Sequence, residues 1–387
     1  MLKPYGEVVA SPYEVAHAEQ PIRELTHRIG SLEGEVRVVM EATGAYHLPL
    51  LEELKKAGIF VSVINPLAMK KYASSSIRKG KTDKMDAVRI ANYGIDNWFK
   101  LTEHVSSEDI RAELCILGRQ YAYYITVKVS LLLALTNLLD RTMPGIKKLI
   151  PASSNPTASE KYKLYDFVEE YQHFDRIAKM GRKRFVASYV RWAKKKGYHR
   201  NEAKAEAIFD LASEGIPTLP SGAQSTKIMT LESVRVLREV CKTVKTILSQ
   251  MQTLAQTLPE YGTVRAMNGV GDTLAPRLIA EIGDVRRFKS GSCLVAYAGI
   301  DSPPFQSGAF TGTRRKISKR GSSLLRKTGY EVMKCLKTTK PAKDNAVYLF
   351  ILKKEAEGKA KKAAKIAGLN KFLRIYYARV MEVYAEA

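Results

Sequence analysis

Residues 106–142, SSEDIRAELCILGRQYAYYITVKVSLLLALTNLLDRT, decide the architecture of this chain. Apolar side chains recur there at intervals of three or four residues, at Leu114, Leu117, Tyr121, Tyr124, Val127, Leu131, Leu135 and Leu138. This stripe predicts one long amphipathic helix of the kind that pairs in a coiled coil. A buried helix of a bundle would show the same stripe. Pro144 and Gly145 end it.

Residues 228–258 carry a second stripe, made of Leu231, Val234, Leu237, Val240, Val244 and Leu248. We expect a second long helix here, which pairs either with the first or with its copy in another subunit. Because both stripes need a partner surface, we also expect a homo-oligomer, at least a dimer.

The first hundred residues have an α/β pattern. Residues 36–40 (VRVVM) and 59–64 (IFVSVI) are short β-branched runs, and residues 46–56 between them have helical spacing. This order predicts a strand–helix–strand unit. A basic loop is predicted over residues 70–81.

Three acidic residues stand where a metal site would need them. Glu41 directly follows the first predicted strand, and Asp83 and Asp86 begin a helix predicted over residues 83–93, with Thr82 as its N-cap. Residues three apart on a helix face the same way, so the two aspartates can act together. Carboxylates that converge from different elements can hold the Mg²⁺ ions of phosphoryl transfer. On spacing alone, favourable charge at a helix N-terminus is the simpler explanation of the aspartate pair.

The middle of the chain is less regular. Residues 153–159 (SSNPTAS) have the composition of a linker, and residues 217–222 mark a second boundary. Between them, residues 182–200 form a basic helical stretch that contains aromatic residues. Such a stretch can stack on bases as well as bind phosphates, or it can be a solvated helix face.

Residues 268–272 (NGVGD) form a Gly-x-Gly turn before a helix predicted over residues 273–282. Glycines at Gly269 and Gly271 would let backbone N–H groups approach phosphates, as in a helix–hairpin–helix-like motif. An ordinary helix–helix turn has the same appearance.

The most distinctive segment is AYAGI at residues 296–300, followed by Ser307-Gly308 and then RRKISKRG at residues 314–321. Seven cations and no acid lie between Arg314 and Lys327. A serine beside such a run can act as a nucleophile on a phosphodiester. A flexible Ser-Gly loop is the alternative interpretation.

The composition points to a polyanionic partner. The formal charge is +24, from 63 Lys and Arg against 39 Asp and Glu. Nucleic acid would neutralise this surplus. A ribosomal or architectural protein would carry the same charge, so charge alone specifies no reaction.

The cysteines give no sign of a metal or of export. They are far apart, none forms a CxxC pair, and we expect them to be buried thiols in a reducing compartment: Cys115, Cys241, Cys293 and Cys335. We recognise no signal peptide, and the longest apolar run, residues 346–352, is too short to span a membrane. We therefore expect a cytoplasmic protein, on the nucleoid if bacterial, with no membrane partner.

Three quoted segments together resemble the insertion-sequence transposases of the IS-one-ten (IS110) type. They are MEATGAYHLPLLEELKKAG at residues 40–58, NPLAMKKYASSSIRKGKTDKMDAVRIA at residues 65–91, and MNGVGDTLAPRLIAEIGDVRRFKSGSCLVAYAGIDSPPFQSG at residues 267–308, continued by RRKISKRGSSLLRK. The resemblance covers nearly the whole chain except about residues 150–225.

The resemblance implies a multidomain α/β plus α protein. Residues 1–104 would be a RuvC-like domain with an RNase H fold, residues 105–258 a coiled-coil and helical linker region, and residues 259–387 a helical C-terminal transposase domain. It also implies an Asp–Glu–Asp–Asp tetrad that binds Mg²⁺, a serine that forms a phosphoserine link to DNA, and a bridge-type non-coding RNA that pairs with both DNAs. The matching positions are Glu41, Asp83, Asp86 and Ser307.

The start departs from the family pattern. Family members open with a GIDVSK-type strand that supplies the first aspartate, whereas this chain opens with MLKPYGEVVASPYEV, which resembles the hairpin that follows, with its turn at Gly6-Glu7. We expect the first strand and its aspartate to be missing, and the activity of the chain to be reduced.

The sequence therefore predicts a DNA transposase or recombinase that binds element ends, target DNA and a bridge-type RNA. A RuvC-like Holliday-junction nuclease and an inactive nucleic-acid-binding relic are the alternatives. The predicted nucleic-acid-binding residues are Gly269, Gly271, Arg314, Arg315, Lys316, Lys319, Arg320, Lys79 and Lys81.

Overall fold

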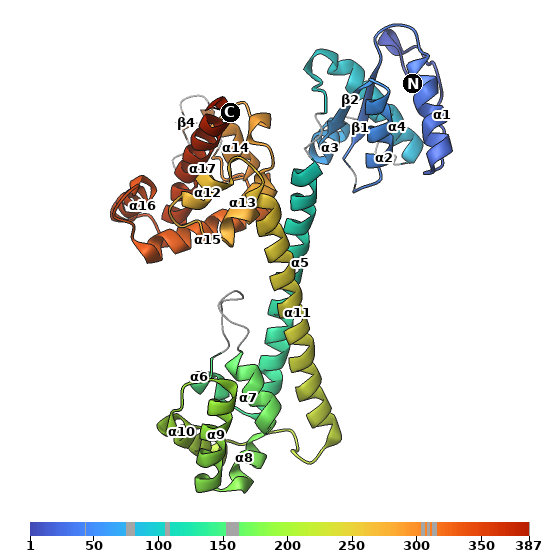
Figure 1. Ribbon diagram of the computed structural model, residues 1–387. Coiled ribbons are helices and arrows are strands. Elements are labelled where there is room, and N and C mark those ends of the chain that lie inside the picture. The colour runs from blue at the N-terminus through green and yellow to red at the C-terminus, as the bar shows by residue number, and fades with distance from the viewer. Residues whose placement is uncertain are drawn as a thin grey trace. The chain divides into compact units, whose positions relative to one another are not determined.

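The computed structural model describes residues 1–42, 44–74, 82–104, 109–151, 162–302, 306–307, 310–311 and 316–386. The chain divides into two compact units, Met1–Ser106 and Ser107–Ala387. Helices make up most of the regular secondary structure of both (Figure 1). The described part is thus multidomain and mostly helical, with very little sheet.

The first unit is the α/β part of the chain. Its elements are η1 (Pro4–Gly6), α1 (Glu19–Gly30), β1 (Arg37–Glu41), α2 (Leu48–Lys56), β2 (Phe60–Ile64), α3 (Pro66–Ser74), α4 (Asp83–Asp96) and η2 (Trp98–Lys100). Strands β1 and β2 are parallel, with Arg37 opposite Phe60 and Glu41 opposite Ile64. The predicted strand–helix–strand unit is confirmed. Part of the predicted loop is wrong, since residues 70–74 belong to α3.

Helix α4 begins and packs as its sequence dictates. The Thr82 hydroxyl accepts a hydrogen bond from the Met85 backbone N–H at 3.2 Å, so the predicted N-cap is confirmed. Further along, a Cβ on Gly94 would lie only 2.9 Å from Val39 Cγ2. The missing side chain at Gly94 therefore lets α4 lie directly against β1.

The chain start forms a tight hairpin. Leu2 and Val8 make an antiparallel bridge, and the Lys3 N–H donates to the Glu7 carbonyl at 2.8 Å. The expected hairpin is present, but its turn lies at Pro4–Gly6, one residue earlier than predicted, and Glu7 is already on the returning arm.

The second unit contains two long helices and two helical groups. Its elements are α5 (Asp109–Thr142), α6 (Ile146–Leu149), α7 (Lys163–Tyr171), α8 (Phe174–Met180), α9 (Arg182–Lys196), α10 (Glu202–Glu214), α11 (Gln224–Gln256), α12 (Tyr261–Ala266), α13 (Leu274–Ile282), η3 (Val285–Arg287), α14 (Gly291–Tyr297), β3 (Gln306–Ser307), β4 (Phe310–Thr311), α15 (Ser323–Thr339), α16 (Ala346–Ala356) and α17 (Lys361–Glu386).

The two apolar stripes cover each other within one chain, because α5 and α11 lie side by side (Figure 1). Gly118 of α5 lies against Met251 of α11, while Leu135 shares a buried cluster with Val234 and Leu237. The start of α5 thus meets the end of α11, so the helices are antiparallel. The pairing of the two stripes is confirmed. The stripes alone no longer require a second subunit.

Helix α5 also corrects one sequence expectation. Ile110–Thr142 is long and apolar enough to cross a membrane, although the sequence analysis found no such stretch. Length and composition are weak evidence, because a core helix passes the same test. Only 17% of the apolar window is buried, so the pairing with α11 covers only part of its apolar side chains.

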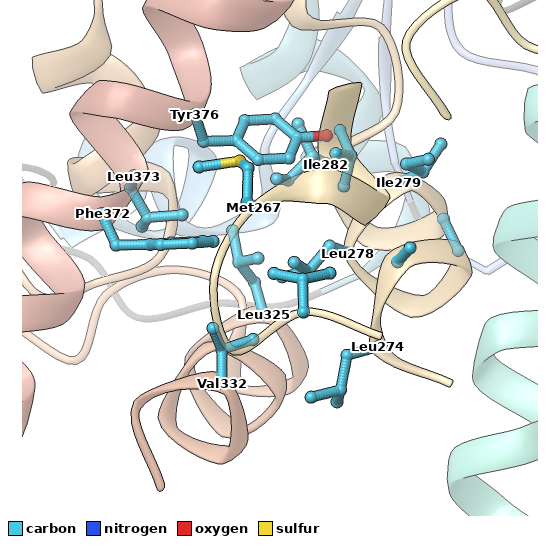
Figure 2. Packing of buried hydrophobic residues seen from close by; sticks show 14 of the residues in the cluster. Met267, Leu274, Leu278, Ile279, Ile282, Leu325, Val332, Phe372, Leu373 and Tyr376 are labelled. Carbon is cyan, nitrogen blue, oxygen red and sulfur yellow. The ribbon is translucent and has the colours of Figure 1, made fainter. Parts of the chain in front are cut away.

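Each end of the α5–α11 pair enters a separate core. At one end, helices α6–α10 surround it with an aromatic-rich cluster that includes Phe167, Phe185 and Tyr189. We call residues 162–223 the insert. At the other end, side chains from α13, α15 and α17 converge in the C-terminal core, where Leu278 and Leu325 are completely buried (Figure 2).

A buried ion pair joins the C-terminal core to α5. Arg111 donates to Glu260 with an Nη2–Oε2 distance of 3.1 Å, and both residues are almost fully buried. The hydroxyl of Tyr384, near the end of α17, donates to the same carboxylate at 2.7 Å. Because an unpaired buried charge is costly, these three groups stabilise one another only as a set.

The cysteine expectation is partly wrong. Cys241 is buried and Cys115 half-buried, but Cys293 and Cys335 are exposed. All four are free thiols.

Charged side chains fasten the insert to α11. Arg238 of α11 donates to Asp166 at 2.6 Å and to Glu169 at 2.9 Å, and Tyr198 donates to Asp166 at 2.5 Å. Burial alone would raise the pKa of Asp166, but the hydrogen bonds from Tyr198 and Arg238 outweigh it and hold the pKa below its usual value.

This network predicts an acid-sensitive insert. Because the folded-state pKa of Asp166 is depressed, its stabilisation is complete above the unfolded pKa of about 4 and is lost as pH falls through the folded value. Asp166→Asn should lower the melting temperature at pH 7, and the difference from the wild type should shrink toward pH 3. Asp210→Asn, which removes an exposed partner of Arg182, is the control and should change little. A difference that is independent of pH would contradict this account.

Candidate functional site

The three predicted metal ligands lie in the first unit, on β1 and α4. Arg37 at the start of β1 donates to the Trp98 carbonyl, and Gly94 lies against Val39. Helix α4 therefore runs back along β1, with its first turn toward the end where Glu41 lies. With rises of about 3.3 Å per strand residue and 1.5 Å per helix residue, Asp86 lies beyond Glu41 along this direction.

The side chains of the three acids differ in their surroundings. Asp83 is exposed, Glu41 is half-buried, and Asp86 accepts a hydrogen bond from Arg89 at 2.8 Å. Among the described residues, no group of three or more His, Cys, Asp or Glu side chains is placed to hold a metal ion. The convergence of all three acids stays a prediction. Their oxygen donors nevertheless suit Mg²⁺, which usually binds one or two carboxylates and completes its shell with waters and substrate phosphates.

Ser307 lies in a short hairpin of the second unit. Strands β3 and β4 are antiparallel, with Ser307 opposite Phe310 and Gln306 opposite Thr311. The predicted binding residues Arg314 and Arg315 lie outside the described residues, as do Lys79 and Lys81 of the first unit.

The segments on either side of this hairpin are bound to each other, and we call these contacts the loop clamp. The Lys319 N–H donates to the Gly299 carbonyl at 3.0 Å, and the Ser318 N–H donates to the Asp301 carbonyl at 2.9 Å. The Ser318 hydroxyl donates to the Asp301 carboxylate as well. AYAGI and ISKRG, far apart in sequence, therefore form one structural element.

Two glycines make the loop clamp possible. A Cβ on Gly321 would lie 2.2 Å from the Tyr297 carbonyl oxygen, and Gly321 has φ +154°. Gly299 has φ +64°, and a Cβ there would lie 2.8 Å from Arg326 Nη1. No other residue fits at either position without a shift of the backbone or of Arg326.

The outgoing side of the loop clamp presents free cations. Lys316, Lys319 and Arg320 are exposed, and the structure gives their side chains no ion-pair partner among the described residues. The next cation, Arg326, instead donates to the Ala298 carbonyl at 2.8 Å and so strengthens the loop clamp. This arrangement can bind phosphates beside the hairpin that carries Ser307.

Helix α15 begins directly after the loop clamp. The Ser322 hydroxyl caps the Leu325 N–H at 2.9 Å and donates to Glu281 of α13 at 2.6 Å. The sequence analysis missed this contact and the one between Asp301 and Ser318, since nothing in their spacing signals them.

The Gly-x-Gly turn joins α12 to α13. Gly269 has φ +81°, and a Cβ there would lie 2.8 Å from the Val332 carbonyl oxygen of α15. This glycine is therefore needed for packing within the chain. Gly271 faces open space, and Asp272 beside it forms an ion pair with Arg265. Phosphate binding at Gly269 and Gly271 stays a prediction.

Two family models match the chain. One, described as "Transposase", matches residues 1–144, and the other, described as "Transposase IS116/IS110/IS902 family", matches residues 262–348. The first segment contains Glu41, Asp83 and Asp86, and the second contains the turn, the hairpin and the loop clamp.

Curated relatives align over most of the chain. The "Insertion element IS110 uncharacterized 43.6 kDa protein" of Streptomyces coelicolor is 23% identical over 310 residues, 79% of this chain and 73% of the relative. The "Insertion element IS116 uncharacterized 44.8 kDa protein" of Streptomyces clavuligerus is 22% identical over 84% of this chain and 77% of its own length. The "Pilin gene-inverting protein" of Moraxella lacunata is 23% identical over 90% of this chain and 80% of its own length.

The geometry of the loop clamp makes Gly321 sensitive to substitution. Gly321→Ala would combine a disfavoured backbone conformation with the clash against Tyr297, and it should lower the free energy of unfolding by about 1–3 kcal/mol. Thermal unfolding measures this. Gly358→Ala is the control for a glycine of positive φ without a clash, because Gly358 has φ +83° and open space around its Cβ position. Equal losses of unfolding free energy in the two variants would contradict this account, because they would show that the clash with Tyr297 costs nothing.

Proposed function

Because this chain belongs to the insertion-sequence transposases of the IS110 type, we propose that it is a DNA recombinase that cuts and rejoins strands through Ser307. The observation that carries the proposal is the loop clamp, which holds the hairpin of Ser307 next to exposed cations within the segment matched to this family.

The proposed chemistry has two steps. Ser307 Oγ attacks the phosphorus of a phosphodiester, its proton leaves to water, and the bond from phosphorus to one sugar oxygen breaks. That oxygen takes up a proton and becomes a hydroxyl. In the second step a sugar hydroxyl of another strand attacks the phosphoserine, which restores the serine and joins the strands. The phosphodiester bond energy is retained, so no external energy source is needed.

Cations near the serine would hold the DNA. Lys316, Lys319 and Arg320, together with Arg314 and Arg315, would neutralise phosphates on both sides of the attacked bond. Gly269 and Gly271 would contact the DNA backbone in the second unit, and Lys79 and Lys81 would bind phosphates in the first unit.

The first unit would contribute a metal site. We assign Glu41, Asp83 and Asp86 as ligands of Mg²⁺. The assignment is based on the family resemblance and on the position of Glu41, at the end of β1 toward which the first turn of α4 points. The ion would stabilise negative charge on a phosphate bound to the first unit. The parallel β1–α2–β2 unit is compatible with an RNase H-like fold.

The name of one relative supports recombination over simple cleavage, and the net charge supports a nucleic-acid partner. A relative that aligns with 90% of this chain is named for inverting a pilin gene, and inversion requires both cutting and rejoining. The charge of +24 calls for a polyanionic partner, and a bridge-type RNA bound together with DNA would supply one.

A homo-oligomer is proposed from the outer face of α5. Between Gln120 and Asn137 this face exposes uncharged residues, among them Tyr123, Val129 and Leu133. The outer face of α11, in contrast, carries exposed charges of both signs, at Lys227, Glu232, Arg235, Glu239 and Lys242. An apolar face along several turns is stabilised by a second copy of the same helix.

The serine chemistry is tested by trapping. With target and donor DNA, the element's RNA and Mg²⁺, the wild type should form a denaturation-resistant protein–DNA adduct, and Ser307→Ala should form none. Ser302→Ala removes a nearby serine at the loop clamp and should keep the adduct. Strand cleavage by Ser307→Ala at the wild-type rate, without an adduct, would instead identify a RuvC-like nuclease. Absence of both adduct and cleavage in the wild type would favour the inactive relic.

The oligomer is tested by light scattering. Leu133→Glu should convert a dimer into a monomer, because it places a charge in the apolar face of α5. Val236→Glu, at an exposed apolar position on α11, is the matched control and should leave the dimer intact. A wild type that is monomeric at micromolar concentration and moderate salt would refute this interface.

A further inference from the structure

Helix α9 of the insert has one strongly cationic face. Its 15 residues include seven Lys and Arg and no Asp or Glu. All seven are exposed, and five of them form the cationic face: Lys183, Arg184, Arg191, Lys194 and Lys195. At about 100° per residue these five lie within an arc of about 120°, along a length of roughly 18 Å. Ala187 is exposed near the middle of this arc.

These five side chains are unneutralised. Arg182 pairs with Asp210 at 2.5 Å, and Lys196 lies 3.4 Å from Asp166. Among the described residues, the structure gives the other five cations of α9 no hydrogen bond or ion pair. They repel one another, and no ion pair among the described residues of the insert offsets this repulsion.

The start of α9 violates the usual electrostatics of helices. A helix N-terminus carries partial positive charge, so cations in the first turn each cost about 0.3–1 kcal/mol. Helix α9 has Lys183 and Arg184 there, no acidic residue, and Gly181 at the N-cap without a capping side chain. Cations in the first turn of a helix, with neither an acidic residue nor a capping side chain beside them, point to an anionic partner outside the chain.

The aromatic residues of α9 restrict what that partner is. Phe185, Tyr189 and Trp192 are buried in the insert core, so the expected base stacking on this helix is wrong for these three residues. A surface with cations but without exposed rings binds phosphates and not unstacked bases. Five cations over roughly 18 Å match about five base-pair steps of a duplex, at about 3.4 Å per step.

We propose that the cationic face of α9 binds the phosphate backbone of a nucleic-acid duplex, without regard to sequence. It is a second nucleic-acid surface of the chain, distinct in sequence from the loop clamp, and it lies between the two segments that the family models match. The proposal goes beyond the proposed function and does not depend on chemistry at Ser307.

The test measures how binding depends on salt. The full chain is titrated with a 20-base-pair DNA duplex and with an RNA duplex of the same sequence, unrelated to any element, at several salt concentrations. Arg191→Gln combined with Lys194→Gln should flatten the slope of log K against log salt by about two units, one for each lost contact. The duplex that shows this change identifies the partner as DNA or RNA. An unchanged slope with both duplexes would overturn the proposal.

The matched control removes the same charge elsewhere. Lys227→Gln combined with Lys242→Gln acts on the outer face of α11, where Glu232 and Glu239 balance the cations, and should leave the slope unchanged. An equal change in both double variants would mean that only net charge matters, and it would also overturn the proposal. Ser307→Ala should bind like the wild type, so a failure of the serine chemistry is distinguishable.

A second variant separates binding from folding. Ala187→Glu places a carboxylate four residues from both Lys183 and Arg191, an arrangement that stabilises helices by about 0.2–0.5 kcal/mol per pair. It should therefore maintain or raise the melting temperature while it weakens duplex binding. Retained binding affinity in this variant would show that the duplex does not contact the cationic face of α9.

Discussion

The apolar seam between α5 and α11 fixes how the two cores of the second unit are separated. Gly118 permits close approach to Met251 at one end, and Leu135 packs with Val234 at the other. Because each helix has more than thirty residues, the seam keeps the insert at one end and the C-terminal core at the other. The Arg111–Glu260 pair and the Asp166–Arg238 pair then fix each core to this helix pair.

The motif residues of the C-terminal segment mainly determine the path and the close contacts of its backbone. Gly299 and Gly321 allow the two segments of the loop clamp to come into contact, and a hydrogen bond from Ser318 to Asp301 holds these segments together. Gly269 permits close contact with α15, which explains its presence without any ligand. Motif residues therefore position the hairpin of Ser307, while the exposed cations beside it are available for DNA.

Features with strong local causes could be predicted from the sequence. The long stripes predicted both helices and their need for a partner, but they left open whether that partner is the other stripe or a second subunit. The N-cap at Thr82 and the parallel strands β1 and β2 follow from equally local patterns.

Features that depend on distant contacts could not be predicted. The exposure of Cys293 and Cys335, the burial of Trp192 and the contact of Gly269 with Val332 depend on neighbours far away in sequence. For the candidate site, spacing identified Ser307 and the cations but not the loop clamp, whose partners Asp301 and Ser318 are 17 residues apart.

The loop clamp also limits the reach of Ser307. Its nearest anchor is Ser302, whose hydroxyl donates to the Lys316 carbonyl at 3.3 Å, and five residues of extended chain span at most about 17 Å. In the proposed chemistry the serine is thus a tethered group, and any phosphate that it attacks must lie inside that radius. A tether this short gives an effective concentration in the millimolar range or above once DNA rests on the neighbouring cations. Selection of the cut site is then a matter of which phosphate is delivered to the anchor, and the serine itself need not discriminate among sequences.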